Sequence, residues 1–262
     1  MFTKSQLDRY SRQLLLPGVG AAGQQKLLES KVLVVGAGGL GSPVLLYLAA
    51  AGVGTLGLVD DDTIDLSNLQ RQVLYGTEQV GEAKTQVAAV RLGNLNPGIC
   101  LETHQTRLTA ENANRLIVPY DLVLDGSDTL ATRYLVSDTC VRLGKPFVYG
   151  ALSPFEGQIA LLRATPDAPC YRCLYPELPP ESSVQNCAEA GVLGPLAGVI
   201  GSLMATEAMK FLLGLGENEA RLTHYDALSG SFRTVKLLRN RTCSSCGEEA
   251  LPVSPILREA YR

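Results

Sequence analysis

Short apolar runs alternate with longer segments of helical spacing over the first 150 residues of the chain. Runs such as KVLVV and TLGLVD are typical of parallel strands that are buried on both faces. The segments between them repeat apolar positions at the spacing of amphipathic helices. The predicted strands are KVLVV, TLGLVD, ICLETH, DLVLDG and KPFVYG, and the predicted helices are SPVLLYLAAAGV, GEAKTQVAAVRLGNLN, TAENANRLIV and TLATRYLVSDTCVRLG. This alternation predicts an α/β fold with a Rossmann-like, mainly parallel, doubly wound sheet.

The two ends of the chain follow other patterns. SQLDRYSRQLLL has the apolar spacing of a helix, and a second short helix is expected over residues 21–29. After Gly150, the segments GQIALLR, RLTHYDA and SFRTVKLL should form antiparallel additions to the sheet, because no crossover helices separate them. A long helix over residues 194–213 should pack beside them. Since no linker or repeat interrupts the chain, we expect one domain over 1–262, with a helical arm (1–30), a core (31–150) and a C-terminal part (151–262).

Composition narrows the class of protein. Hydrophobic residues make up 46% and charged residues 19% of the 262 residues, so the chain can bury a sizeable core. A sequence-independent nucleic-acid binder would normally be basic, and the formal net charge is −3. The N-terminus lacks the apolar centre of a signal peptide. The most apolar stretch, 191–215, contains Pro195, Glu207 and Lys210, which favours a buried helix over a membrane span. We therefore expect a cytoplasmic protein with neither a nucleic-acid nor a membrane partner.

A glycine-rich turn follows the first predicted strand. Gly36, Gly38 and Gly41 match the spacing G-x-G-x-x-G, and Gly39 lies between them. Glycine lets a phosphate approach the backbone, and the following helix offers unpaired N–H groups to an anion. Asp60 ends the second strand, where a carboxylate can bind ribose hydroxyls. We expect a nucleotide site in the core 31–150; the alternative is a glycine turn used only for close packing.

The residues after Asp60 bear on which nucleotide is bound. NAD is the usual partner of such a turn. Here the turn is followed by DDDTIDLSNLQRQ, which contains Arg71, and by Lys84 on the next helix. Cations of this kind suit a triphosphate whose charge must be neutralised during a reaction. On their own they could equally be solvated surface charges.

Four of the seven cysteines form two CxxC pairs, Cys170 with Cys173 and Cys243 with Cys246. Four thiolates match a tetrahedral zinc site, and a site filled by protein ligands alone is structural, because no position remains for water. The zinc would join two distant parts of the segment 151–262. Alternatives are two unrelated thiol pairs, an iron–sulfur centre, or redox motifs, although neither pair is expected at a helix N-terminus of a thioredoxin-like unit.

From Arg9 to about Cys246 the chain resembles the MoeB/ThiF/HesA family, the bacterial relatives of the ubiquitin-activating enzymes. The resemblance rests on RYSRQLLLPG, GAGGLGSP, LVDDDTIDLSNLQRQ, GEAKTQVA, LVLDGSDT, EGQIALL, PCYRCLYP, NCAEAGVLGPLAGVIGSLMATEAMK and the closing CSSC. It implies that Asp60 holds the ribose of ATP. It also implies that Asn68 and Arg71 contact the triphosphate region, that Lys84 contacts the phosphates, and that Asp128 positions Mg²⁺. An aspartate such as Asp128 could otherwise be a helix cap.

The resemblance also implies a homodimer, in which Arg12 reaches the ATP of the opposite subunit; taken alone, Arg12 would be an exposed cation on an amphipathic helix. Cys187 lies where family members carry a cysteine that can take part in sulfur or acyl transfer. It could be a nucleophile if its pKa were lowered, for example by Arg172, or it could have no role. Cys100 and Cys140 fall within a predicted strand and helix and are expected in the core.

The activity that the resemblance implies is ATP-dependent adenylation of the C-terminal Gly-Gly carboxylate of a ubiquitin-like sulfur-carrier protein. A persulfide-bearing sulfurtransferase would then supply sulfur, in molybdopterin, thiamine or a related pathway that the motifs do not distinguish. Two hypotheses from other classes stay open. One is an NAD-dependent oxidoreductase that uses the same glycine turn, and the other is a non-catalytic, zinc-stabilised scaffold that binds ubiquitin-like proteins.

Overall fold

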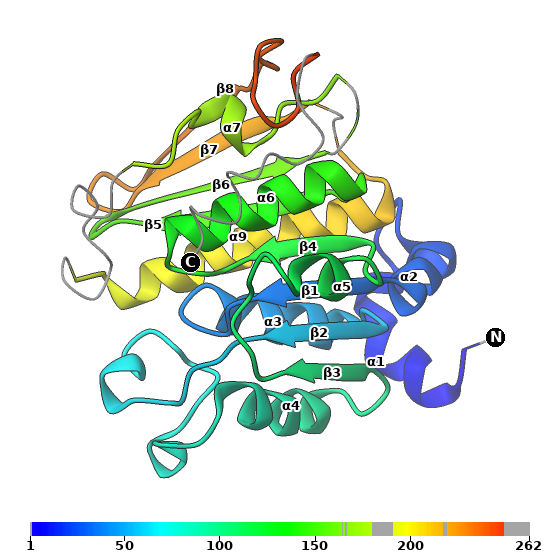
Figure 1. The fold of residues 1–262 in the computed structure, drawn as a ribbon. Helices are drawn as coiled ribbons and strands as arrows, with labels where there is room; N and C mark the ends of the chain where they lie inside the picture. Colours follow the sequence, from blue (N-terminus) through cyan, green and yellow to red (C-terminus); the bar gives the residue numbers. More distant parts are fainter. Residues whose placement is uncertain (1, 164, 166, 180–190, 217–218, 249–262) are drawn as a thin grey trace.

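One continuous eight-stranded sheet forms the centre of the computed structural model, in the order β3-β2-β1-β4-β5-β6-β7-β8 (Figure 1). The structure describes residues 2–163, 165, 167–179, 191–216 and 219–248. Strands β1 to β5 are parallel, and β6, β7 and β8 are antiparallel additions. The strands are β1 (Lys31–Val35), β2 (Thr55–Val59), β3 (Cys100–His104), β4 (Leu122–Asp125), β5 (Phe147–Leu152), β6 (Glu156–Leu162), β7 (Arg221–Asp226) and β8 (Ser231–Lys236). The predicted mainly parallel sheet with antiparallel C-terminal strands is confirmed.

Helices cover both faces of the sheet because successive residues of its central strands point to opposite sides. Along β1, Val32 and Val34 join one hydrophobic cluster, whereas Leu33 and Val35 join the other. The first cluster contains residues of α3 and α9, and the second contains residues of α5 and α6. The helices are α1 (Lys4–Leu14), α2 (Gly20–Glu29), α3 (Gly41–Ala51), α4 (Lys84–Leu95), α5 (Ala113–Ile117), α6 (Leu130–Leu143), α7 (Tyr171–Leu174) and α9 (Gly194–Leu213), with 3₁₀ turns η1 (Leu66–Asn68) and η2 (Thr77–Gln79).

The long apolar helix α9 is part of this core. By length and composition it could cross a membrane. It packs instead against α3 and against β5 and β6, and Ile200, Met204 and Ala208 on it are fully buried. It ends at Gly214, whose φ of +72° is the left-handed cap that glycine adopts readily. The predicted buried helix over residues 194–213 is therefore found.

Two expectations about local structure were wrong. The predicted helix TAENANRLIV is reduced to α5, because Asn112 and Thr109 form a turn before it, with the Asn112 Oδ1 accepting the Thr109 N–H over 2.8 Å. Cys100, expected in the core, is exposed. It begins β3, an edge strand that pairs only with β2. Cys140 is buried as expected, with 2% of its surface exposed.

The strand order places a topological switch between β1 and β4. The chain leaves β1 towards β2 on one side and reaches β4 on the other, so the loops after β1 and β4 diverge at the carboxyl ends of two paired strands. Ligands of open α/β sheets bind in this crevice. The glycine turn follows β1, and the sequence Gly126–Asp128 follows β4. The topology therefore brings these two loops together.

Candidate functional site at the carboxyl ends of the parallel strands

A cavity of about 470 Å³ lies at this switch point. The loops after β1, β2, β3 and β4 all contribute to its wall, together with the segment after η1 and the start of α4. Seven residues for which the sequence predicted a role line this cavity: Gly36, Gly38, Gly39, Asp60, Arg71, Lys84 and Asp128. Residues scattered over some 90 positions of sequence thus meet at one site, as the nucleotide hypothesis requires.

The glycines of the turn serve two different purposes. A Cβ on Gly41 would lie 2.0 Å from the carbonyl oxygen of Gly36, and a Cβ on Gly36 would lie 3.0 Å from the backbone of Gly126. These two glycines allow close packing of the turn. A Cβ on Gly38 would meet nothing closer than the Gln72 side chain at 3.5 Å, so Gly38 keeps the turn open towards the cavity. The packing interpretation therefore explains Gly36 and Gly41 but not Gly38.

Asp60 is bound to the glycine turn. Its Oδ2 accepts the N–H of Ala37 over 2.7 Å, and its Oδ1 accepts the N–H of Asp62 over 2.9 Å. Burial raises the pKa of Asp60, while the Ala37 N–H acts in the opposite direction. Each carboxylate oxygen can accept a further hydrogen bond. Asp60 therefore lies at the cavity wall in a fixed orientation, as a carboxylate that holds two hydroxyls should.

The two predicted cations differ in how they are held. Lys84 is only 4% exposed although it is charged, and its Nζ lies 2.9 Å from Asp62 Oδ2. A buried lysine beside a cavity is not a solvated surface charge. Arg71 is half-buried; its stem packs over Gly39, and its Nη1 donates to the carbonyl oxygen of Ser67 over 3.1 Å. Both cations therefore face the same cavity from different elements.

Asp128 lies in the loop after β4 with its side chain exposed to the cavity. It does not cap the following helix, because Thr129 is the N-cap of α6 and its side chain accepts the N–H of Thr132. Capping thus does not account for Asp128, which lines the cavity.

Two predicted polar residues do not line the cavity. The Asn68 side chain forms a capping box with Asp65, which accounts for it structurally. Arg12 is exposed on the last turn of α1 and does not line the cavity. Cys187 lies outside the described residues. Its suggested activator Arg172 is bound to Asp138 through Nη2 over 2.9 Å.

Several residues that line the cavity were given no role from the sequence. Gln72 is 4% exposed, and its Oε1 is buried without a hydrogen-bond partner in the described part of the chain. Arg133, from α6, reaches the cavity wall beside Ser127. Arg107 enters it from the loop after β3. The sequence offers no signal that singles out Arg133, because its burial is seen only in the fold.

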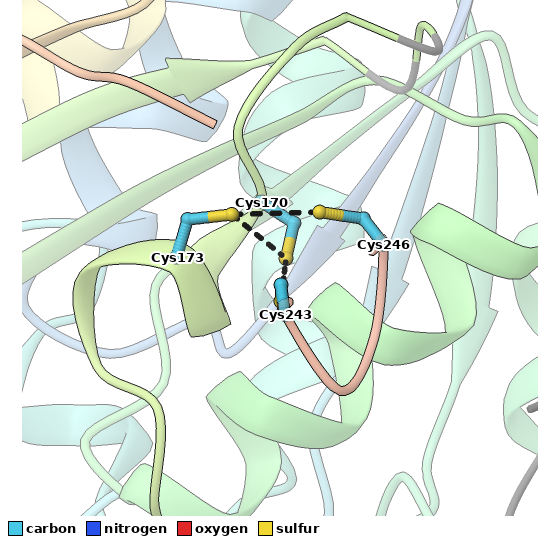
Figure 2. Close-up of side chains that lie close together, drawn as sticks. All are labelled: Cys170, Cys173, Cys243 and Cys246. Carbon is cyan, nitrogen blue, oxygen red and sulfur yellow. Dashed lines mark hydrogen bonds between the residues drawn. The ribbon is translucent and has the colours of Figure 1, made fainter. Parts of the chain in front are cut away.

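The two CxxC pairs meet at one point, although 73 residues separate them (Figure 2). The Sγ of Cys170 lies 3.6 Å from that of Cys243, and the Sγ of Cys173 lies 3.4 Å from that of Cys246. Thiolates bound to one tetrahedral zinc at ~2.3 Å would be about 3.8 Å apart. A disulfide would need ~2.05 Å. All four ligand atoms lie within 4.8 Å of one another, so the donor set fits zinc.

Cys170 does lie at a helix N-terminus, as the N-cap of the one-turn helix α7, although no thioredoxin-like unit was predicted around it. Hydrogen bonds from the Cys170 thiol and the Asn240 N–H, among other contacts, lower the pKa of Cys173 to about 6. Both features occur in redox CxxC motifs as well. The convergence of the second pair, however, makes a four-thiolate metal site the better explanation.

Comparison with known proteins shows the family of this chain. The ThiF family model matches residues 10–246, and the chain belongs to the ThiF family. A relative from Thermus thermophilus, named sulfur carrier protein adenylyltransferase, is 54% identical over 99% of this chain and 98% of its own length. The SAMP-activating enzyme E1 of Haloferax volcanii is 49% identical over 93% of this chain and 90% of its own length.

The fold also has solved counterparts. The crystal structure of E. coli MccB with ATP superposes with a TM-score of 0.81 and 24% sequence identity, covering 94% of this chain and 75% of that one. At this identity the likeness concerns the fold alone.

Proposed function

We propose that this protein uses ATP to adenylate the C-terminal carboxylate of a ubiquitin-like sulfur-carrier protein that ends in Gly-Gly. The observation that carries the proposal is the cavity in which Asp60, Arg71, Lys84 and Asp128 converge on the glycine turn. It combines a carboxylate for a ribose, cations for phosphates and a carboxylate for a metal. The relatives named as carrier-activating enzymes match nearly the whole chain.

In this proposal an oxygen of the carrier carboxylate attacks the α-phosphorus of ATP. The bond from that phosphorus to the bridging oxygen of the β-phosphate breaks, and pyrophosphate leaves with the bonding electrons. Lys84 and Arg71 would offset the charge that develops on the leaving group, and Asp128 would hold the Mg²⁺ that accompanies ATP. The turn at Gly38 leaves room for the phosphates to approach the backbone.

Further parts of the proposal concern Arg12 and Asn68, which do not line the cavity, and Cys187, which lies outside the described residues. Arg12 would enter the site of a partner subunit in a homodimer. Asn68 would contact the triphosphate after leaving its cap. Cys187, or a persulfide on a separate sulfurtransferase, would take the acyl group from the adenylate, and AMP would leave. The protein would work in the cytoplasm with zinc bound at the four cysteines as a structural ion.

The experiment that tests the proposal is ATP–pyrophosphate exchange with candidate carriers that end in Gly-Gly. We expect exchange that needs the carrier and Mg²⁺, and that falls by about 100-fold or more in Lys84→Ala and Asp128→Ala. Lys26→Ala is the matched control, because Lys26 is exposed on α2 away from the cavity. A folded, zinc-bound protein that supports no exchange with any carrier would contradict the proposal. In that case, binding of NAD would favour the NAD-dependent oxidoreductase. Binding of a carrier without binding of ATP would favour the non-catalytic scaffold.

A further inference from the structure

A buried ion pair lies directly behind the loop that carries Asp128. Asp125, the last residue of β4, is fully buried, and Arg133 of α6 is 5% exposed. The Arg133 Nε donates to Asp125 Oδ2 over 3.3 Å. A buried ion pair is weak support for stability in itself, because well-packed apolar side chains often replace one at little cost. Its place beside the cavity therefore calls for another explanation.

Both members of the pair hold the backbone of the same residue, Ser127. The Oδ1 of Asp125 accepts the N–H of Ser127 over 2.9 Å. The Nη2 of Arg133 donates to the carbonyl oxygen of Ser127 over 3.2 Å. Ser127 directly precedes Asp128, so both peptide groups that flank Ser127 are fixed by side chains of the pair. The direction in which the chain presents Asp128 to the cavity follows from these two contacts.

The surroundings fix the pair in turn. The guanidinium of Arg133 lies over the ring of Tyr149, 5.8 Å from its centroid, and it also interacts with the Tyr171 hydroxyl. On the other side, the backbone at Gly126 packs so tightly against the glycine turn that a Cβ on Gly36 would lie 3.0 Å from it. The loop is thus held between the ion pair on one side and the glycine turn on the other.

We propose that Arg133 and Asp125 are positioning residues for adenylation, which set Asp128 at the place where it holds the metal and the phosphates of ATP. This inference rests on the proposed function, because it assigns to Asp128 the role given there. Arg133 lines the cavity, but the contacts described above commit its guanidinium to Asp125, Ser127 and Tyr171. It therefore acts through Asp128.

The primary test is Arg133→Lys, which keeps the positive charge opposite Asp125 but lacks the planar fork that bonds Asp125 and Ser127 together. Arg142→Lys on the same helix is the matched control, because Arg142 is exposed. We expect Arg133→Lys to lower kcat of carrier-dependent ATP–pyrophosphate exchange by about 100-fold. The KM for ATP should change much less, and the Mg²⁺ concentration for half-maximal exchange should rise several-fold. A purely structural role would lower the melting temperature without changing the Mg²⁺ requirement.

A second variant guards against failure to fold. The double variant Asp125→Asn, Arg133→Gln leaves no unpaired buried charge, and we expect it to show the same loss of kcat and the same raised Mg²⁺ requirement. Wild-type kcat and Mg²⁺ dependence in either folded variant would overturn the proposal.

Calorimetry of ATP binding at several Mg²⁺ concentrations distinguishes failure of this proposal from failure of the proposed function. Wild-type protein that binds ATP with Mg²⁺ but exchanges no pyrophosphate would overturn the function alone, and the altered Mg²⁺ dependence of binding would still report on the pair. Wild-type protein that binds no ATP would overturn both.

Discussion

The hydroxyl of Tyr75 donates to the carbonyl oxygen of Ala37 over 2.8 Å, and so helps to fix the glycine turn. Asp60 binds the N–H of the same alanine. The N–H and the carbonyl oxygen of Ala37, which belong to the two peptide units on either side of its Cα, are therefore held by side chains from two different segments. Burial raises the pKa of Tyr75 far above its usual range, so the hydroxyl stays protonated and remains a donor at any ordinary pH.

Tyr75→Phe removes this hydrogen bond and leaves the Ala37 carbonyl oxygen without it. We expect ATP to bind about fivefold more weakly, which corresponds to the ~1 kcal/mol of a typical internal hydrogen bond. The melting temperature should fall by only ~2–4 °C in a chain of this size. Isothermal titration calorimetry with ATP measures the effect, and Tyr47→Phe is the control, because Tyr47 is 56% exposed on α3. Unchanged ATP affinity would show that the turn does not depend on Tyr75.

The glycines of the turn should respond differently to one added methyl group. Gly41→Ala would place a Cβ 2.0 Å from a carbonyl oxygen, so we expect a protein that is strongly destabilised or does not fold. Gly38→Ala meets only the Gln72 side chain at 3.5 Å, so we expect a folded protein that binds ATP at least about tenfold more weakly. Thermal melts and ATP titrations of the two variants separate these effects. Normal ATP binding by Gly38→Ala would contradict the placement of phosphates at this turn.

Zinc should be required for stability. Cys170→Ser removes one of four ligands, and we expect loss of the bound zinc and a stability loss of more than about 3 kcal/mol. Cys100→Ser should change neither quantity, because Cys100 is exposed and outside the cluster. Elemental analysis and thermal melting check both variants. Full zinc content in Cys170→Ser would rule out the four-thiolate site. If the wild-type protein contained iron in place of zinc, the four cysteines would be assigned to an iron–sulfur centre.

Arg12 provides a test of the homodimer. If it acts on the ATP of the partner subunit, Arg12→Ala and Asp128→Ala should each be inactive alone. Random mixing of the two variants should restore activity at about a quarter of the wild-type sites, since half of the dimers then contain one intact site. Denaturation and joint refolding, or co-expression, followed by the exchange assay would show this. No recovery in verified mixed dimers would place Arg12 in its own subunit's site or outside any site.

The sequence was sufficient for most of the fold, because the evidence for each element was local. The continuous run KVLVV becomes a strand buried on both faces, and the glycines at 52 and 214 end α3 and α9 with positive φ. Local patterns did not predict the exposure of Cys100. An apolar neighbour on each side predicts burial, but strand order decides whether a strand lies at an exposed edge of the sheet. Strand order depends on contacts between distant segments, which a single sequence does not display.

Several motif residues of the candidate site could be predicted from the sequence, but the residues that hold them in place could not. Gly38, Asp60, Lys84 and Asp128 line one cavity as the resemblance implied. Arg133, in contrast, resembled any arginine of a helix, and only the fold shows that Asp125 lies beside it in the core. This ion pair forms because the helix and the strand pack together, so the sequence pattern does not reveal it.

The most direct test of the central claim is intact mass spectrometry of a Gly-Gly carrier that has been incubated with this protein, ATP and Mg²⁺. We expect the carrier to gain the mass of one AMP moiety at its C-terminus. A carrier that lacks the final glycine should not gain it, and Asp128→Ala protein should produce no such species. A carrier whose mass never changes, although the wild-type protein is folded, binds zinc and binds ATP, would contradict the central claim.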